Sequence, residues 1–220
     1  TGNEYFMNNI QYTDDQYEML KEVVNLAMGQ AGKDLATILN SFVDLSVPEI
    51  QIVEAEHIAE KVLKESVFNE NERVNLFRQN FHSMSFMEGE AIVIFNNETR
   101  QKVAKILGVE EQTNSMEEID FMLELTNLMV GACLNSISEQ LFNQKMSFSP
   151  PELLSENSVF RNIAYETFKR RNLKWEYTLL SKITFVLKDR SFKSDLLIFI
   201  SEKAIQAVNE SLNKMLADYE

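Results

Sequence analysis

Two stretches of the sequence carry acidic, amide and glycine residues at the same spacing. The first contains Glu18, Glu22, Asn25 and Gly29, and the second contains Asp120, Glu124, Asn127 and Gly131. Carboxylates pair with cations, and an amide both donates and accepts hydrogen bonds. A glycine inside a helix costs about 1 kcal/mol relative to alanine and leaves a shallow gap on the surface. Each stretch could therefore dock a partner that presents a cationic surface.

Helical geometry places each set on one side of a helix. At roughly 100° per residue, the two acids and the amide of each copy fall within about 60° of one another, outside the middle of the apolar stripe. A lone acidic pair on a helix is usually only solvated, and a helix glycine can serve close packing. The joint recurrence of non-core residues argues for two docking ridges instead. In both copies, 22 residues separate the asparagine from a proline, Pro48 or Pro150.

The repeat extends beyond the two motifs. A shift of 102 residues places Leu39 on Leu141 and Pro48 on Pro150, together with every motif position. The order of long helix, proline, strands, hairpin and short helix occurs twice, with an extra helix before the second hairpin. We therefore expect a single domain over residues 1–220, made of two repeats at about 14–108 and 115–218. Its fold class is α+β, a duplicated pseudo-two-fold unit with long motif helices packed on an antiparallel β-sheet and with the helices all on one side of that sheet.

Apolar periodicity and capping residues predict the individual elements. We expect helices from Asp14 or Asp15 to about Ser41, from Asn97 or Thr99 to Leu107, from Ser115 to about Phe142, over most of Glu152–Arg171, and from Glu202 to about Leu216. We expect strands in PEIQIVEA from Pro48, in NERVNLFRQNFHSMSF and GEAIVIFNN around a turn at Met87–Glu90, and in EYTLLSKITFVLKD and SDLLIFIS.

Composition excludes several classes of function. The net charge of -13 lacks the excess of Lys and Arg that a nucleic-acid binder needs. The apolar runs are far shorter than the ~20 residues of a membrane-spanning helix, and the polar, acidic start does not resemble a signal peptide. The single cysteine cannot form an intramolecular disulfide. We therefore expect a cytoplasmic protein without membrane insertion.

Other catalytic chemistries have little support in the sequence. His57 and His82 have no ligand partner nearby in sequence, so a zinc site is not expected. Cys133 lies inside the second motif helix without a neighbouring His or Lys, which is typical of a packed residue rather than a nucleophile. No glycine-rich nucleotide-binding motif occurs.

The motif residues resemble the signature of the CheC/CheX/FliY phosphatases of bacterial and archaeal chemotaxis. That signature is an acid, a Glu four residues later, an Asn three residues after it, and a Pro separated from the Asn by 22 residues. Two copies in one chain most resemble CheC. The first copy has Glu18 where the family usually has Asp or Ser, so Asp120 makes the second copy the better match. The segment from about Ser155 to Glu176 is longer and more basic than expected in CheC.

The resemblance implies hydrolysis of the aspartyl phosphate on a CheY-like response-regulator receiver domain. Glu22 or Glu124 would pair with the receiver's lysine, and Asn25 or Asn127 would insert and hold the attacking water in line with the phosphorus. Glu18 and Asp120 would be auxiliary, and Pro48 and Pro150 would shape the start of the following strand. The phosphatase would need no cofactor of its own, because the receiver supplies Mg²⁺.

A second reading is an adaptor without catalytic activity. It would bind a receiver domain, a CheD-like protein or a flagellar switch component through the same helix faces. A CheD-like protein is also a further candidate partner for the enzyme. The presence of the amide in both copies favours the enzyme, because docking alone does not require it.

Overall fold

The computed structural model describes residues 12–40, 42–46, 48–84, 87–96, 115–169, 177–187 and 193–218. Its helices are α2 (Asp14–Ile38), α3 (Ile58–Glu65), α5 (Ser115–Phe142), α6 (Phe160–Lys169) and α7 (Glu202–Ala217), with a 3₁₀ turn at Ala55–His57. Its strands are β1 (Val43–Leu45), β2 (Glu49–Glu54), β3 (Arg73–His82), β4 (Glu88–Asn96), β5 (Ser147–Phe148), β6 (Glu152–Val159), β7 (Tyr177–Leu187) and β8 (Lys193–Ile200).

The strands form one antiparallel sheet that joins the two halves of the sequence. Its order is β1-β7-β8-β4-β3-β5, with β2 also paired to β7 and β6 also paired to β3. Thus β1 and β2 of the first half pair with β7 of the second, whereas β5 and β6 of the second half pair with β3 of the first. The two hairpins meet through β4 and β8 at the centre. Exchanging the halves reproduces the same pairing, which is a pseudo-two-fold arrangement.

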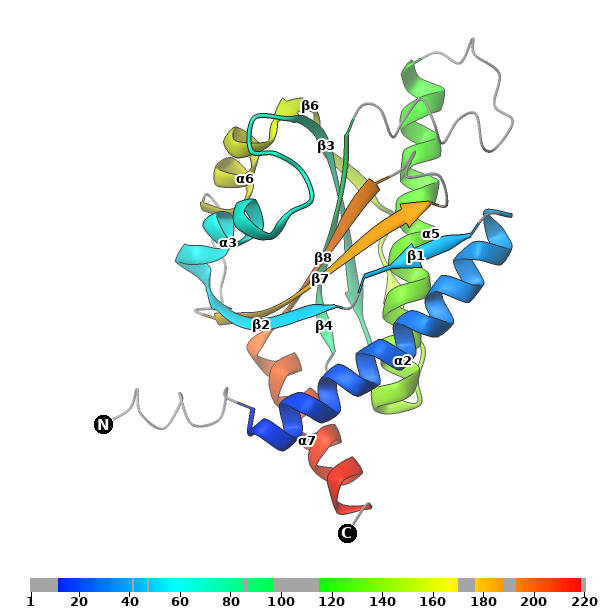
Figure 1. Ribbon diagram of the computed structural model, residues 1–220, viewed down its shortest axis with the longest axis vertical. Helices are drawn as coiled ribbons and strands as arrows, with labels where there is room; N and C mark the ends of the chain where they lie inside the picture. Colours follow the sequence, from blue (N-terminus) through cyan, green and yellow to red (C-terminus); the bar gives the residue numbers. More distant parts are fainter. Residues whose placement is uncertain are drawn as a thin grey trace.

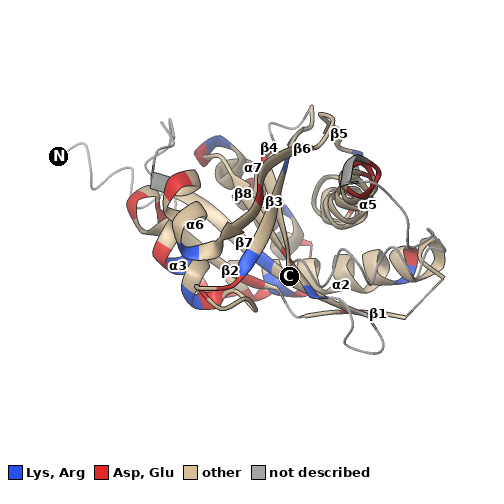
Figure 2. Cartoon of the chain, turned by 90° about the horizontal axis from the view of Figure 1, so that it is seen from above, with Lys and Arg blue, Asp and Glu red and all other residues tan. Residues whose placement is uncertain are grey.

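Helices cover both faces of this sheet (Figures 1 and 2). Residues of α2, α5 and α7 form one hydrophobic core with one face, and residues of α3 and α6 form a second core with the other. The α+β fold with long motif helices on an antiparallel sheet is confirmed. The expectation that all helices lie on one side is wrong, because α3 and α6 bury apolar residues against the opposite face.

The ends of α2 differ slightly from the prediction. The cap at its start is Thr13, not Asp14 or Asp15: Gln16 N donates to Thr13 Oγ1 at 3.2 Å, and Thr13 N donates to the Gln16 side chain at 2.7 Å. This is a capping box, which satisfies two N–H groups that the helix leaves free. The helix ends at Ile38 and not near Ser41.

Three other predictions from the sequence need correction. Residues 152–159 form β6 and residues 160–169 form α6, so the predicted helix over Glu152–Arg171 is wrong in its first half. The turn predicted at Met87–Glu90 is wrong over 88–90, because these three residues already belong to β4. The first half also contains α3, which the sequence reading missed. The short helix predicted to end at Leu107 lies outside the described residues.

The apolar helix α5 is a core helix. Among the described residues, the stretch Glu117–Phe142 is the one helix long and apolar enough to cross a membrane, with a mean hydropathy of 1.2. However, 56% of that apolar window is buried, and α5 packs against α2 and the sheet. The apolar residues of α5 therefore already have a partner inside the fold.

Candidate functional site

Helix α2 presents the first motif to solvent. Glu18, Glu22, Asn25 and Gly29 are all exposed, and we call them the first ridge. The helix holds this face outward because its other side, which includes Val24 and Ala27, is buried in the core. Leu26 extends the first ridge with an apolar side chain that is 60% exposed.

Helix α5 presents the second motif in the same way. Asp120, Glu124 and Asn127 are exposed and Gly131 is partly exposed, and we call these four the second ridge. Leu128, which corresponds to Leu26, is only partly exposed and packs against the core formed by α2, α5 and α7 with the sheet. The glutamate and asparagine of both motifs are thus accessible, as a docking role requires.

The acids of the first ridge differ in their local contacts. Lys21 Nζ lies 2.8 Å from Glu18 Oε1 and 4.3 Å from the centre of the Tyr17 ring. The hydrogen bond to Glu18 raises the pKa of Lys21, so this lysine stays charged. Within the described residues, Glu22 and Asn25 form no hydrogen bond or ion pair. Glu22 and Asn25 are therefore available to an incoming partner.

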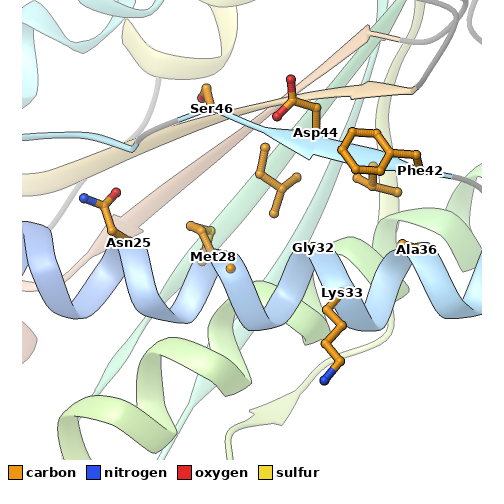
Figure 3. Close-up of a pocket in the computed structure, with 11 residues that line it drawn as sticks. Asn25, Met28, Gly32, Lys33, Ala36, Phe42, Asp44 and Ser46 are labelled. Carbon is orange, nitrogen blue, oxygen red and sulfur yellow. The ribbon is translucent and has the colours of Figure 1, made fainter.

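Two grooves flank the first ridge, and Asn25 and Gly29 line both. One groove, of about 570 Å³, lies between α2 and β1 and is also lined by Met28, Phe42 and Asp44. In Figure 3 the Asn25 side chain points toward this strand, whereas Lys33 points away. The other groove, of about 700 Å³, runs along the acidic half of α2. Asn25 and Gly29 thus lie between two hollows of the surface.

Packing within the described residues does not explain the motif glycines. A Cβ atom built on Gly29 or on Gly131 would meet no atom of another segment within 4 Å. Both residues lie inside helices, where glycine is less stable than alanine by about 1 kcal/mol. The described fold would accept alanine at both positions, so the fold does not require these glycines.

Each motif proline lies one or two residues before a strand that pairs with the other half of the chain. Pro48 is buried and immediately precedes β2, whereas Pro150 is exposed and lies two residues before β6. Their positions match the expected place at the start of the following strand.

The sequence reading missed Gln79, which contacts the second ridge. Gln79 Nε2 donates to Asn127 Oδ1 at 2.6 Å and to the Ser149 carbonyl oxygen at 2.8 Å. Gln79 is 1% exposed and lies on β3 between Phe77 and Phe81, with its side chain on the face covered by the long helices. The available signal was an amide at a core-facing position of the strand, in alternation with Phe77 and Phe81.

The remaining reactive side chains lie away from the ridges. Within the described ranges, the one group of His, Cys, Asp and Glu close enough to share a cation is Glu54, Glu56 and His57, all exposed. Cys133 is fully buried in the core formed by α2, α5 and α7 with the sheet. Burial raises the pKa of its thiol, so the thiol stays protonated. Neither feature touches the motif residues.

Structural comparison finds similar folds where sequence comparison finds no match. No protein-family model matches the chain, and no curated protein sequence matches it significantly. FliY of Thermotoga maritima superposes with a TM-score of 0.66 at 19% identity, covering 92% of this chain and 98% of FliY. The FliM middle domain of H. pylori gives 0.56 at 9% identity, covering 91% and 99%.

The chemotaxis protein CheX of Vibrio vulnificus gives a TM-score of 0.50 at 13% identity, covering 82% of this chain and 97% of CheX. The resemblance to the CheC/CheX/FliY proteins is therefore confirmed at the level of the fold, which the FliM middle domain shares. This chain has the fold of the CheC/CheX/FliY family of chemotaxis proteins.

Proposed function

We propose that this protein hydrolyses the aspartyl phosphate of a CheY-like receiver domain, in chemotaxis or related two-component signalling. The observation that carries the proposal is the pair Glu22 and Asn25, which is exposed, free of described partners and set between two grooves. The fold shared with FliY and CheX supports the same function. The cytoplasm, where receivers reside, is the proposed location.

The first step is docking. Glu22 or Glu124 pairs with the lysine of the receiver's phosphorylation site, and this contact aligns the ridge with the phosphoryl group. An acidic chain, with a net charge of -13, favours a partner that offers such a cation. The gap at Gly29 or Gly131 lets the receiver's surface approach the helix closely.

The second step is attack by water. Asn25 or Asn127 enters the receiver's site and holds a water in line with the phosphorus. The water oxygen forms a bond to phosphorus as the bond from phosphorus to the aspartyl oxygen breaks. The products are inorganic phosphate, which takes up the water's oxygen, and a free aspartate on the receiver, while the proton passes to the phosphate or to solvent. An amide suits this task because it orients water without adding negative charge near the phosphate.

We propose that the phosphatase itself contributes no metal. Mg²⁺ belongs to the receiver substrate, where it neutralises the phosphoryl oxygens. Glu18 and Asp120 assist through electrostatics or contacts with the receiver.

The alternative is an adaptor that binds a receiver, a CheD-like protein or a flagellar switch component. The specific observation in its favour is the FliM middle domain, which superposes with a TM-score of 0.56. The exposed Leu26 would suit binding without chemistry equally well.

A phosphate-release assay separates the two functions. Receiver domains are phosphorylated with a small phosphodonor and Mg²⁺, and the loss of phosphate is followed with and without this protein. Wild type should accelerate the loss, and the double variant N25A/N127A should abolish the acceleration while keeping receiver binding. The exposed Asn162 on α6 provides the matched control N162A. If wild type binds a receiver without speeding dephosphorylation across a receiver panel, the adaptor is correct.

A further inference from the structure

The hydrogen bonds of Gln79 define which atom of Asn127 it holds. A backbone carbonyl only accepts, so the group that faces the Ser149 oxygen must be the Gln79 NH₂. The same NH₂ lies 2.6 Å from the Asn127 side chain, and that neighbour must therefore be the acceptor oxygen Oδ1. Gln79 is 1% exposed. The side-chain oxygen of Asn127 thus accepts a hydrogen bond from a buried NH₂ group that also donates to Ser149.

The pseudo-two-fold arrangement identifies the residue on β7 that corresponds to Gln79. Asn80 and Ser149 exchange two hydrogen bonds, Ser149 N to Asn80 O at 3.0 Å and Asn80 N to Ser149 Oγ at 3.1 Å. Thr184 and Ser46 exchange two hydrogen bonds between the same atoms, Ser46 N to Thr184 O and Thr184 N to Ser46 Oγ, each at 2.9 Å. Thr184 is therefore equivalent to Asn80.

The residue before Asn80 is Gln79, so the residue before Thr184 is its equivalent. That residue is Ile183, which is fully buried in the same core. An isoleucine side chain cannot donate a hydrogen bond. Consistently, no described residue bonds to the Asn25 side chain. Asn127 therefore accepts a hydrogen bond from β3 and Asn25 accepts none from β7, because Gln79 can donate and Ile183 cannot.

We propose that the two ridges are not equivalent, and that Asn25 performs most of the hydrolysis because Gln79 restrains Asn127. This inference rests on the proposed function. Asn127 reaches into the receiver's site only by turning its side chain away from β3, which breaks its bond from Gln79. Breaking that bond leaves a buried N–H without an acceptor, which lowers the rate at the second ridge by about ten-fold. Gln79 is a positioning residue in this account, because it acts through Asn127.

Three variants test the proposal with a phosphorylated receiver and Mg²⁺. The rate should fall about ten-fold further in N25A than in N127A. Gln79→Ile copies the residue of the first half, and it should raise the rate of N25A several-fold by releasing Asn127. The same change should have no effect on the rate in an N127A background, since its influence passes through that asparagine. N162A again serves as the control.

Side-chain NMR supplies a readout that does not depend on hydrolysis. In wild type, the NH₂ protons of Gln79 should exchange slowly with water, and N127A should speed that exchange. The restraint is overturned if these protons exchange as fast as those of an exposed glutamine. The catalytic assignment is overturned if N127A loses more activity than N25A, or if Q79I fails to raise the rate of N25A.

Failure of the proposed function looks different. A wild-type protein that hydrolyses no receiver phosphate overturns that function, and with it the assignment of hydrolysis to Asn25. The exchange measurement would still decide whether Gln79 holds Asn127.

Discussion

Gly89 lies so close to Phe199 that a Cβ atom on Gly89 would stand 2.0 Å from the Phe199 carbonyl oxygen. The contact lies at the centre of the sheet, where β4 meets β8. Phe81 closes the same space, with its Cζ 2.8 Å from that Cβ position. The fold therefore requires a glycine at position 89, in contrast to Gly29 and Gly131, whose surroundings are open.

Replacing Gly89 with alanine should destabilise the fold by about 3 kcal/mol, because the backbone of Phe199 cannot move away without opening the central strand pair. Urea unfolding followed by circular dichroism measures this loss. A G89A variant as stable as wild type would show that the two central strands separate easily.

Replacing Gly29 with alanine should have the opposite effect on stability. The helix should gain up to about 1 kcal/mol, since alanine is the better helix former and its methyl group meets no neighbour. Activity should nevertheless fall, because the methyl group fills the gap on the first ridge. The check is to measure unfolding and receiver dephosphorylation on the same preparation. If G29A is stabilised and fully active, the receiver does not use the gap.

Reversing the charge of Glu22 should weaken docking more than chemistry. Lysine at this position would repel the receiver's lysine, so KM should rise by about ten-fold or more while kcat changes less. N25A should show the converse, a lower kcat at similar KM. The matched control is Glu60→Lys, which makes the same change at an exposed position of α3 on the other side of the sheet.

The docking contribution of Glu22 should also depend on salt. Added salt screens exposed charges, so the KM of wild type should rise with ionic strength and approach that of E22K. Equal KM values for wild type and E22K at low salt would remove Glu22 from the docking surface.

The sequence could predict the long helices and the exposed motifs because their signals are local. Apolar spacing defined α2 and α5, and the same spacing placed the acids and amides outward. A local signal was also available for α3, where Ile58, Ala59 and Val62 form a buried stripe. That stripe is short, and the two strand-like runs beside it obscured it.

The errors arose where distant segments decide the structure. Residues 152–159 have no strand-like alternation, and they extend because they pair with β3 through a register that shifts twice. Gly89 suggested a turn, but its small size serves the contact with Phe199. The bond from Gln79 to Asn127 spans 48 residues of sequence, so no local pattern could reveal it.

Cys133 should be inert in the folded protein. Burial raises the pKa of its thiol above that of an ordinary cysteine, so the reactive thiolate does not form as the pH rises from 7 to 9. A thiol reagent should therefore modify native protein no faster than the protein unfolds, at both pH values, and modify it completely in urea. Rapid modification at pH 9 without denaturant would show that α5 opens readily.

Asp195 should be a principal stabilising residue, because it is fully buried and joins the two halves. Its Oδ2 accepts from Ser66 Oγ at 2.7 Å and from Val67 N at 2.9 Å, and its Oδ1 accepts from Thr184 Oγ1 at 2.7 Å. Removing the carboxylate leaves these three donors without that acceptor. Asp195→Ala should therefore cost about 3 kcal/mol or more.

The measurement for Asp195 is urea unfolding, together with hydrogen exchange over residues 58–68. Exchange should rise there first, since Asp195 fixes the segment after α3 to β8. The exposed Asp44 provides the control D44A, which should change the free energy of unfolding by less than about 0.5 kcal/mol. If D195A loses no more than this control, the loop after α3 is held by its apolar contacts, such as the buried Phe68, and not by the carboxylate.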